Sequence, residues 1–523
     1  MATPDKIFPI MCRPGVQRDG TAFDSNAHLD SLWCRWYQGR PQKMGGYNKM
    51  IGWDTHVPRG IFVVPNAPLF NIYVGDSNFL KYFPADNQTG LAVGPYVDRT
   101  PASMVVSQYN VWSFDVMFST VDDGGILVAM ATQNLYAIDQ TVETPIFYGD
   151  ILANTALIET GFRTSGGFVV LHPYLFIFGN DGHVKWTASN DPTVLLNDAR
   201  VTGSKIVFGL PVRGGNSSPA GLLWSLDSVI RVTNTGAGDA TEFRFDTITS
   251  ESSILSSRGV IEYDGLYYWA GVDRFLFYNG IVQEVPNDMN LQYFFDNVNY
   301  AQREKVWATK FTKYGEIWWH YPSGNNTECD SAIIYNVREK TWYDSGSIPS
   351  TVPLVPSSIT RSAGYFNQTY TLPIWADSAL DAGTGQYIIW NHGVGTDKVI
   401  DGIPTAIHSF FKMSYVSWVA DGPGGQNAAT DKTVYAYRLE PDFIQTGTLT
   451  LTVTGKQYAS SPLPDEAATY LFSQDPLSVN YKQKVDIHEQ RRLMSLKFES
   501  NEVGGYYQMG KCLWVARMGD TRP

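Results

Sequence analysis

The sequence has few charged residues, and most of those are acidic. Asp, Glu, Lys and Arg make up 17% of the chain, below the ~25% that is usual in soluble domains. With 51 acidic and 39 basic residues, the formal net charge is −12. Such a chain is poorly suited to gripping nucleic acid, because phosphates are bound by Lys and Arg. An acidic surface would instead let DNA slide past without capture.

Cysteine is scarce as well. No two of the four cysteines form Cys-x-x-Cys, and no histidine stands at zinc-finger spacing from them. We therefore expect unpaired, buried or half-buried thiols in a reducing compartment, and neither a metal nor a cofactor. The four residues are Cys12, Cys34, Cys329 and Cys512.

Long apolar segments are absent too. No run of about 18 apolar residues occurs, so we predict no membrane span. The first residues, Met-Ala-Thr-Pro-Asp-Lys, include no apolar core of a signal peptide, so we expect no secretion signal.

Motifs of common enzymes are missing from the sequence. It contains no Gly-x-Ser-x-Gly, no His-Glu-x-x-His and no P-loop, and Gly236-Ala237-Gly238 lacks both a third glycine and a following helical pattern. A propeller glycosidase would need two carboxylates at one mouth, and the candidates lie mainly in turns, where Asp is favoured for its own hydrogen bonds. We therefore predict that the chain is not an enzyme. The candidate acids are Asp122, Asp123, Glu262, Asp264 and Asp273, and the scattered histidines are His172, His183, His320, His392, His408 and His488.

Aromatic residues, at 14% of the chain, occur in a recurring unit of paired strands and tight turns. The clearest copy spans residues 260–282 and contains Asp264-Gly265 and Asn279-Gly280, dipeptides typical of type I′ hairpin turns. Similar units return about every 45 to 50 residues, a period typical of propeller blades. We predict a β-propeller over residues 59–404, with six or seven blades because the spacing is irregular. A short helix is expected within residues 290–302.

The C-terminal part has a different pattern. Residues 448–454 alternate strictly between Thr and Leu or Val, and residues 493–498 do much the same, which indicates half-buried antiparallel strands. We therefore predict an all-β chain: a six- or seven-bladed β-propeller with an appended C-terminal β-sandwich at residues 405–523. The boundary could instead fall within residues 422–427. Residues 1–58 are predicted to be an N-terminal arm and an entry strand.

The entry segment carries residue types that are common in protein interfaces. Trp33, Arg35, Trp36, Tyr37 and Arg40 lie within eight positions, and Trp, Tyr and Arg dominate interface energetics. We interpret them as a subunit interface. Two other interpretations stay open: a site where nucleic-acid bases stack, and a strand edge with a cationic rim.

Several segments together resemble one family, the tail nozzle or tail hub proteins of short-tailed bacteriophages, also called packaged-DNA stabilisation proteins. The entry segment from Trp33 to Tyr47 resembles that family's aromatic, Gly-Arg-Pro and Lys-x-Gly-Gly segment. The resemblance covers most of the chain and is weakest over residues 80–160 and 350–430. Other similar stretches are residues 189–192, 218–228, 261–280, 307–319 and 335–343.

The resemblance implies a virion structural protein. Such proteins form a ring, typically a homohexamer, below the head-to-tail adaptor ring, and they close and then conduct the exit channel of the genomic double-stranded DNA. Tail fibres or a tail tip or needle protein attach to them, and they reside in the virion tail after assembly in the host cytoplasm. The family carries no catalytic residues to transfer. The loop with Arg213, Gly214, Gly215 and Asn216 is our candidate for narrowing the channel.

Two other functions compete with this one. The first is a glycan hydrolase or lyase built on a propeller, such as a tail depolymerase, which would need acids or histidines converging in one funnel. The second is a monomeric protein-binding propeller of the kelch or WD type, although neither repeat signature is regular here.

Overall fold

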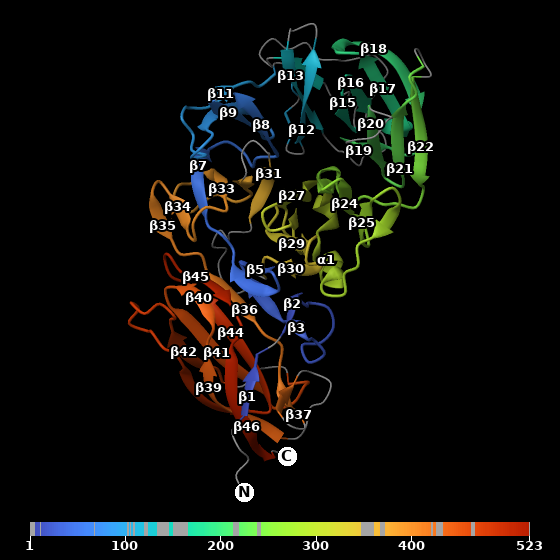
Figure 1. Ribbon diagram of the computed structural model, residues 1–523. Helices are drawn as coiled ribbons and strands as arrows, with labels where there is room; N and C mark the ends of the chain where they lie inside the picture. The colour runs from blue at the N-terminus through green and yellow to red at the C-terminus, as the bar shows by residue number, and fades with distance from the viewer. Residues whose placement is uncertain are drawn as a thin grey trace.

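The computed structural model shows an all-β protein with one short α-helix among the described residues, α1 (Leu291–Asn297) (Figure 1). The helix lies inside the segment predicted to be helical, and a 3-10 helix, η4 (Tyr300–Lys305), follows it. The structure describes residues 6–10, 12–66, 68–101, 104, 106–107, 110–119, 124–132, 146–149, 166–212, 219–237, 242–346, 360–366, 372–419, 422–424, 432–461 and 466–521.

Six antiparallel sheets follow one another in the described residues from 60 to 344, each a meander of consecutive strands. One of the two expected hairpin dipeptides forms as predicted: Asp264 and Gly265 both have positive φ between two paired strands. At Asn279-Gly280 only Gly280 has positive φ, so that turn is not of type I′. The sheets are β8 (Gly60–Asn66), β9 (Leu69–Gly75), β10 (Leu80–Asp86) and β11 (Val97–Asp98); β12 (Val111–Ser119), β13 (Gly124–Thr132) and β14 (Ile146–Gly149); β15 (Gly167–Leu171), β16 (Tyr174–Phe178), β17 (His183–Ala188) and β18 (Asp191–Arg200); β19 (Ile206–Pro211), β20 (Ala220–Ser225), β21 (Val229–Asn234) and β22 (Phe243–Thr249); β23 (Ile261–Tyr263), β24 (Leu266–Ala270), β25 (Phe275–Tyr278) and β26 (Val282–Glu284); and β27 (Trp307–Phe311), β28 (Glu316–Tyr321), β29 (Ser331–Asn336) and β30 (Thr341–Asp344).

A further sheet combines strands from the two ends of this region. Its order is β31-β32-β33-β7-β34-β35, and β7 comes from the N-terminal segment, where it pairs antiparallel with β33 from Tyr387↔Trp53 to His392↔Tyr47. The strands are β31 (Arg361–Tyr365), β32 (Ile374–Asp377), β33 (Tyr387–His392), β7 (Tyr47–Trp53), β34 (Lys398–Ile400) and β35 (Ile403–Thr405).

These sheets surround a common centre, as the upper half of Figure 1 shows. β8 contacts β12, β12 contacts β15, and β15 contacts β19; farther round, β27 contacts β31, which returns to β8. The arrangement is that of a β-propeller, and we call it the ring. Each sheet buries its faces against its neighbours, which explains why the strand sequences are so rich in aromatic and β-branched residues.

One arginine connects several sheets at the centre of the ring. Arg258 lies in a 3-10 turn, η3 (Ser257–Gly259), that contacts β19 and β27. Its guanidinium donates to the backbone carbonyls of Arg59, Ser362 and Lys305, which belong to or precede β8, β31 and β27. Because three sheets supply acceptors to one planar group, Arg258 fixes their inner edges relative to one another.

The C-terminal domain, below the ring in Figure 1, is built from three sheets that also take strands from the N-terminal segment. Strands from the predicted arm at residues 1–58 complete sheets in both parts of the molecule, because four of them pair with strands far along the chain. The sheets are β4 (Asp30–Leu32), β36 (Ser409–Lys412), β44 (Leu493–Ser500), β41 (Leu449–Lys456) and β42 (Ala468–Phe472); β1 (Lys6–Pro9), β46 (Leu513–Thr521), β39 (Lys432–Glu440) and β43 (Val485–Arg491); and β40 (Phe443–Thr446), β45 (Tyr506–Met509), β6 (Arg40–Lys43) and β5 (Cys34–Tyr37), with two small pairs, β2 (Arg13–Val16) with β3 (Ala27–His28) and β37 (Ser417–Val419) with β38 (Gly422–Gly424).

The two strands predicted in the C-terminal part differ in how far their residues are buried. Strand β41 buries Leu449, Leu451 and Val453 and leaves the intervening threonines half-buried, as the alternation predicts. Strand β44 is buried at nearly every position. The half-buried strand predicted at residues 493–498 is therefore wrong; β44 lies between β36 and β41 and also packs against β39 of the neighbouring sheet.

The chain crosses from the C-terminal domain to the ring at Gly45 and Gly46, between β6 and β7. Gly46 donates to the carbonyl of Gly395 and accepts from the amides of Gly393 and Val394. A Cβ on Gly46 would lie 2.2 Å from the carbonyl oxygen of Asp397, whereas a Cβ on Gly45 would lie 3.2 Å from its nearest neighbour, the Cα of Gly393.

This contrast gives a matched pair of variants. Gly46→Ala should lower the free energy of unfolding by about 3 kcal/mol or more, because backbone atoms must move, and Gly45→Ala by only about 1 kcal/mol. Urea titration followed by tryptophan fluorescence measures both. Equal losses for the two variants would show that the chain does not cross at such close range.

Candidate functional site at the junction of ring and C-terminal domain

The entry segment lies between the ring and the C-terminal domain. Strands β5 and β6 pair with each other and join β45 of the C-terminal domain, while their side chains reach ring strands β28 and β30. Trp33, Arg35 and Trp36 are at most 2% exposed. The entry segment therefore lies at the junction between the two parts of the molecule.

Arg35 and Glu316 form a buried ion pair at this junction. Arg35 Nε lies 2.8 Å from Glu316 Oε1, and the two side chains are 2% and 0% exposed. Glu316 also accepts from Trp318 Nε1 at 2.9 Å and from the Tyr343 hydroxyl at 2.7 Å. The Arg35 guanidinium stacks 3.6 Å from the centre of the Tyr314 ring. A buried charge is tolerated when it is paired and hydrogen-bonded in this way.

The neighbouring residues of β5 bind the C-terminal domain. The carbonyl of Trp33 accepts from Ser409 Oγ, which also hydrogen-bonds to the Tyr507 hydroxyl. Burial raises the pKa of the Cys34 thiol to about 12. The Trp33 side chain packs edge-to-face against Trp318, which belongs to the propeller ring. The residues at the start of β5 therefore contact both parts of the molecule.

Lys43, at the end of β6, is also buried in the junction. Its side chain is 1% exposed, and its ammonium donates to the carbonyl of Gly505 at 2.7 Å. Burial lowers the pKa of Lys43 to about 8, although the carboxylates of Asp397 and Glu502 favour the charged form.

These contacts correct the predicted assembly interface. Trp33, Arg35 and Trp36 are buried against residues of their own chain, so they cannot contact a second subunit in this fold. Tyr37 is half-buried and Arg40 is exposed, so of the five predicted residues these two remain at the surface. The side chains of Trp33, Arg35 and Trp36 pack instead between the ring and the C-terminal domain of one chain.

A second buried polar cluster lies beside the junction, in the sheet that contains β7. Arg361 of β31 donates to the Asp377 carboxylate and to His392 Nε2, and all three side chains are at most 3% exposed. Burial raises the pKa of Asp377 to about 6 in spite of Arg361, and burial together with Arg361 holds the pKa of His392 well below its usual range. Trp375 packs on His392 at 4.0 Å between ring centres.

Sequence reasoning missed Glu316, Tyr343, Arg361 and Asp377 as structural residues. A signal exists for Glu316, because it is an acid directly before Ile317, Trp318 and Trp319 in a strand that must be buried. An acid in such a strand requires a buried partner, and Arg35 is 281 positions away.

The centre of the ring holds a cavity of about 210 Å³ lined mainly by aromatic and aliphatic residues of the inner strands. One carboxylate, Asp115, lines it, and this carboxylate accepts from the backbone amides of Val116 and Val170. The aromatic residues that line the cavity are Phe62, Trp112, Phe114, Phe168, Phe208, Trp307 and Tyr365.

The structure does not bring the other candidate residues together in this cavity. Asp264 and Asp273 are exposed, and Glu262 pairs with Lys310. His320 and His392 are buried near Trp375, whereas His172 and His488 are exposed and His183 and His408 are half-buried. Asp122, Asp123 and the predicted channel loop at Arg213, Gly214, Gly215 and Asn216 lie outside the described residues.

Three further observations describe the chain as a whole. All four cysteines are free, with Cys12 half-buried and the other three buried, as expected. In the described residues, no three His, Cys, Asp or Glu side chains are grouped so as to hold a metal ion. The same part of the chain contains no helix with the length and hydropathy of a membrane span.

Comparison with known proteins gives little further information. No family model and no curated protein matches the sequence. Among solved structures, the chain is similar to the computationally designed Ika8 protein (10% identity, 66% of this chain and 99% of that one, TM-score 0.36), to a chain of the mitotic checkpoint complex (10%, 75% and 96%, 0.36) and to BamB from Moraxella catarrhalis (15%, 74% and 98%, 0.35). At these TM-scores the likenesses support no conclusion about fold or function.

The buried ion pair of Arg35 and Glu316 predicts that a single substitution strongly lowers the stability of the fold. Glu316→Gln leaves the Arg35 charge buried without its partner and should lower the free energy of unfolding by about 3–5 kcal/mol. The control is Asp288→Asn, which breaks the ion pair of Arg13 and Asp288, whose side chains are 45% and 68% exposed. That control substitution should lower the free energy of unfolding by at most about 1 kcal/mol. Similar urea midpoints for the two variants would contradict a buried pair.

Lys43 predicts a pH dependence of stability. The pKa of Lys43 is about 8 in the folded state and near 10.5 in the unfolded chain. Between these two pH values the unfolded state binds more protons than the folded state. The free energy of unfolding should therefore rise as the pH increases from 8 to 10.5. In Lys43→Met this contribution is absent. The difference in free energy of unfolding between wild type and variant, measured at half-unit pH steps, should change over that window, and parallel profiles would contradict the assignment.

Proposed function

We propose that this chain is a subunit of a ring-shaped tail nozzle of a short-tailed bacteriophage virion, placed below the head-to-tail adaptor, where it closes and then conducts the DNA exit channel. The observation that carries the proposal is the entry segment. One of the segments on which the resemblance rests, Trp33 to Tyr47, joins the ring and the C-terminal domain.

As part of the same proposal, the ring is a seven-bladed β-propeller and the C-terminal domain contains a β-sandwich. Support for seven blades comes from the seven successive sheets formed by the described residues, of which the last is completed by β7. Support for a sandwich comes from contacts between the five-stranded C-terminal sheet and the sheet that contains β1, namely β39 with β44 and β41 with β43.

Charge is compatible with a conducting role. The chain has 12 more acidic than basic residues, and many of its basic groups that the structure describes are held in ion pairs, among them Arg18 with Asp344, Arg59 with Glu328 and Lys398 with Asp381. Cations held in such largely buried pairs are not presented to phosphate, so they add little salt-sensitive attraction for DNA.

The glycan hydrolase and the monomeric binding propeller remain alternatives with distinct signatures. The hydrolase would turn over polysaccharide and would lose that activity when one carboxylate is substituted. Among the described residues that line the cavity at the ring centre, Asp115 is the carboxylate to substitute. The binding propeller would stay monomeric at all concentrations and with the adaptor present.

Two measurements on the purified chain test the proposal. Mass photometry and negative-stain imaging with the adaptor ring should show closed rings, typically of six copies. Gel-shift titration with duplex DNA should show weak, salt-sensitive binding, with a dissociation constant of about 10⁻⁴ M or weaker at physiological salt. A chain that stays monomeric beside the adaptor, or that binds DNA tightly and independently of salt, would contradict the nozzle.

A further inference from the structure

One of the four cysteines differs from the others in its surroundings. Cys34, Cys329 and Cys512 are buried, and burial raises the pKa of each of these thiols to about 12. Cys12 is half-buried and lines a hollow of about 420 Å³ where the N-terminal segment meets the C-terminal domain. Volumes of roughly 300–1,000 Å³ are usual for small-molecule sites. Cys12 is therefore the cysteine that a small molecule can reach.

A histidine lines the same hollow. Strands β2 and β3 pair in parallel, with Arg13 opposite Ala27, so Cys12 just before β2 and His28 in β3 both face the hollow. The His28 side chain is 3% exposed, and its Nδ1 lies 3.1 Å from the carbonyl oxygen of Arg13. Because a carbonyl oxygen only accepts, Nδ1 carries the proton in this contact, which leaves Nε2 as the basic nitrogen.

Aromatic rings fix the orientation of this imidazole. The ring centres of Trp36 and Phe411 lie 4.9 Å and 5.7 Å from that of His28, and both aromatic side chains are buried. The imidazole is therefore held both by packing and by its hydrogen bond to the Arg13 carbonyl. A base that is oriented by a third group and lies beside a thiol is the arrangement that activates a cysteine as a nucleophile.

The groups around Cys12 favour the ionised form of its thiol. Burial by itself would raise the pKa of Cys12, but the charge of His28 and hydrogen bonds with His28 and Ser414 outweigh it, so the pKa lies below its usual value. The Ser414 hydroxyl oxygen lies 3.7 Å from Cys12 Sγ. The thiolate is the form of cysteine that attacks an electrophile. Cys12 thus combines access from the hollow with neighbours that favour the thiolate.

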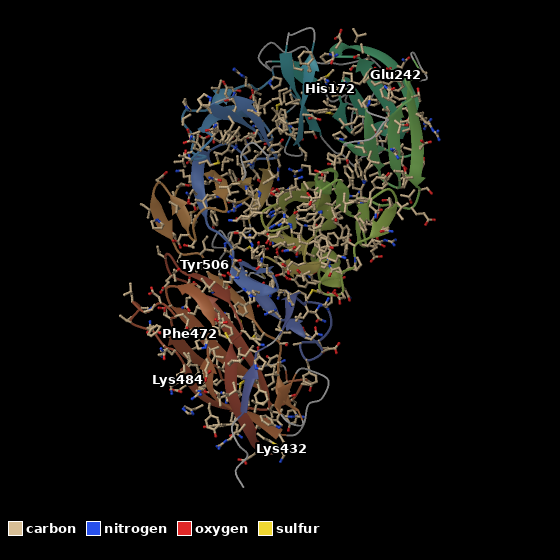
Figure 2. All side chains as sticks on the ribbon, in the orientation of Figure 1. His172, Glu242, Lys432, Phe472, Lys484 and Tyr506 are labelled. Carbon is tan, nitrogen blue, oxygen red and sulfur yellow. The ribbon has the colours of Figure 1, made fainter. Side chains whose placement is uncertain are left out.

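The rest of the lining suits a partner that contains sulfur. Met413 and Met509 line the hollow and are each 4% exposed, and methionine is a polarisable side chain that adapts its shape to what it contacts. Met509 ends β45, whose first residue, Tyr506, is labelled in Figure 2 on the side of the domain toward the ring. The charged residues that line the hollow together with Cys12 and His28 are Arg40, Asp442 and Lys511.

We propose that Cys12 and His28 form a reactive thiol site, at which a low-molecular-weight disulfide enters the hollow and leaves one of its two halves on Cys12. The product is a mixed disulfide that excess thiol reverses. The inference does not rest on the proposed nozzle function, since the ring could assemble with Cys12 free or modified.

The reaction balances with the disulfide as its only co-reactant. Cys12 gives its proton to His28, and the thiolate attacks one sulfur of the disulfide. A new bond forms between Cys12 Sγ and that sulfur while the bond between the two sulfurs of the disulfide breaks. The departing half leaves as a thiolate and takes the proton back from His28. Cys12 is oxidised and the departing half is reduced.

Intact-mass spectrometry of the chain incubated with oxidised glutathione tests the site. Wild type should gain one glutathione, which dithiothreitol removes, and Cys12→Ser should gain none. The rate for wild type should rise with pH through a midpoint below about 8.5, the usual value for a cysteine, because the thiolate is the reacting form. A wild type that gains no glutathione, gains it first on another cysteine, or has its midpoint at 8.5 or above would overturn the inference.

Variants of the neighbouring residues test the role of the imidazole. His28→Gln removes the base, so the rate at pH 6.5 should fall about tenfold or more, the change in thiolate fraction for one unit of pKa. Ser414→Ala should slow the reaction by a smaller factor. The matched control is His408→Gln on the same domain, where the imidazole contacts Glu499 instead, and it should react like wild type.

Tryptophan fluorescence shows whether each variant is folded. If His28→Gln unfolds, Ser414→Ala and the pH midpoint of wild type still decide the question. Folded His28→Gln that reacts as fast as wild type, with the same pH midpoint, would overturn activation by His28. An unreactive Cys12 would leave the nozzle proposal standing, and a chain that never assembles into rings would leave the thiol site standing.

Discussion

The structure depends on the ladder between β7 and β33. The last sheet of the ring receives its fourth strand from residues 47–53, which pair with residues 387–392 in an antiparallel register. Without β7, β33 would present an unpaired edge, and an unpaired edge invites pairing with another chain. The ladder therefore closes the ring and also holds the N-terminal segment, whose first described strand, β1, pairs with β46 in the C-terminal domain (Figure 1).

Because β7 is fixed in the ring, the residues just before it must lie where the ring meets the C-terminal domain. Gly45 and Gly46 make the close crossing, and β5 and β6 then enter a C-terminal sheet. The interior of this junction is polar as well as aromatic, because Arg35 and Glu316 form a pair of charges removed from water. Such a pair is costly to leave unsatisfied, and it joins a residue of β5 to a residue of the ring strand β28.

Much of the fold follows from local patterns in the sequence. Asp264-Gly265 forms a hairpin turn because both residues adopt positive φ, residues 290–302 contain the helix, and the Thr alternation of residues 448–454 gives the half-buried strand β41. Partners distant in sequence were not predictable. Nothing near Tyr47 indicates that its strand pairs with residue 392, and Trp33, Arg35 and Trp36 were assigned to a subunit contact because interfaces between chains and within chains favour the same residue types. The burial of β44 also depends on the elements packed against its sheet, among them β39, which its own sequence does not encode.

Cryo-electron microscopy of the intact virion tail tests the central claim most directly. The account predicts several copies of this chain around the DNA channel below the adaptor, each with β7 in its own ring and with Arg35 paired to Glu316 of the same chain. Tail density that cannot accommodate this fold, or β7 exchanged between neighbouring copies so that the junction forms between chains, would contradict it.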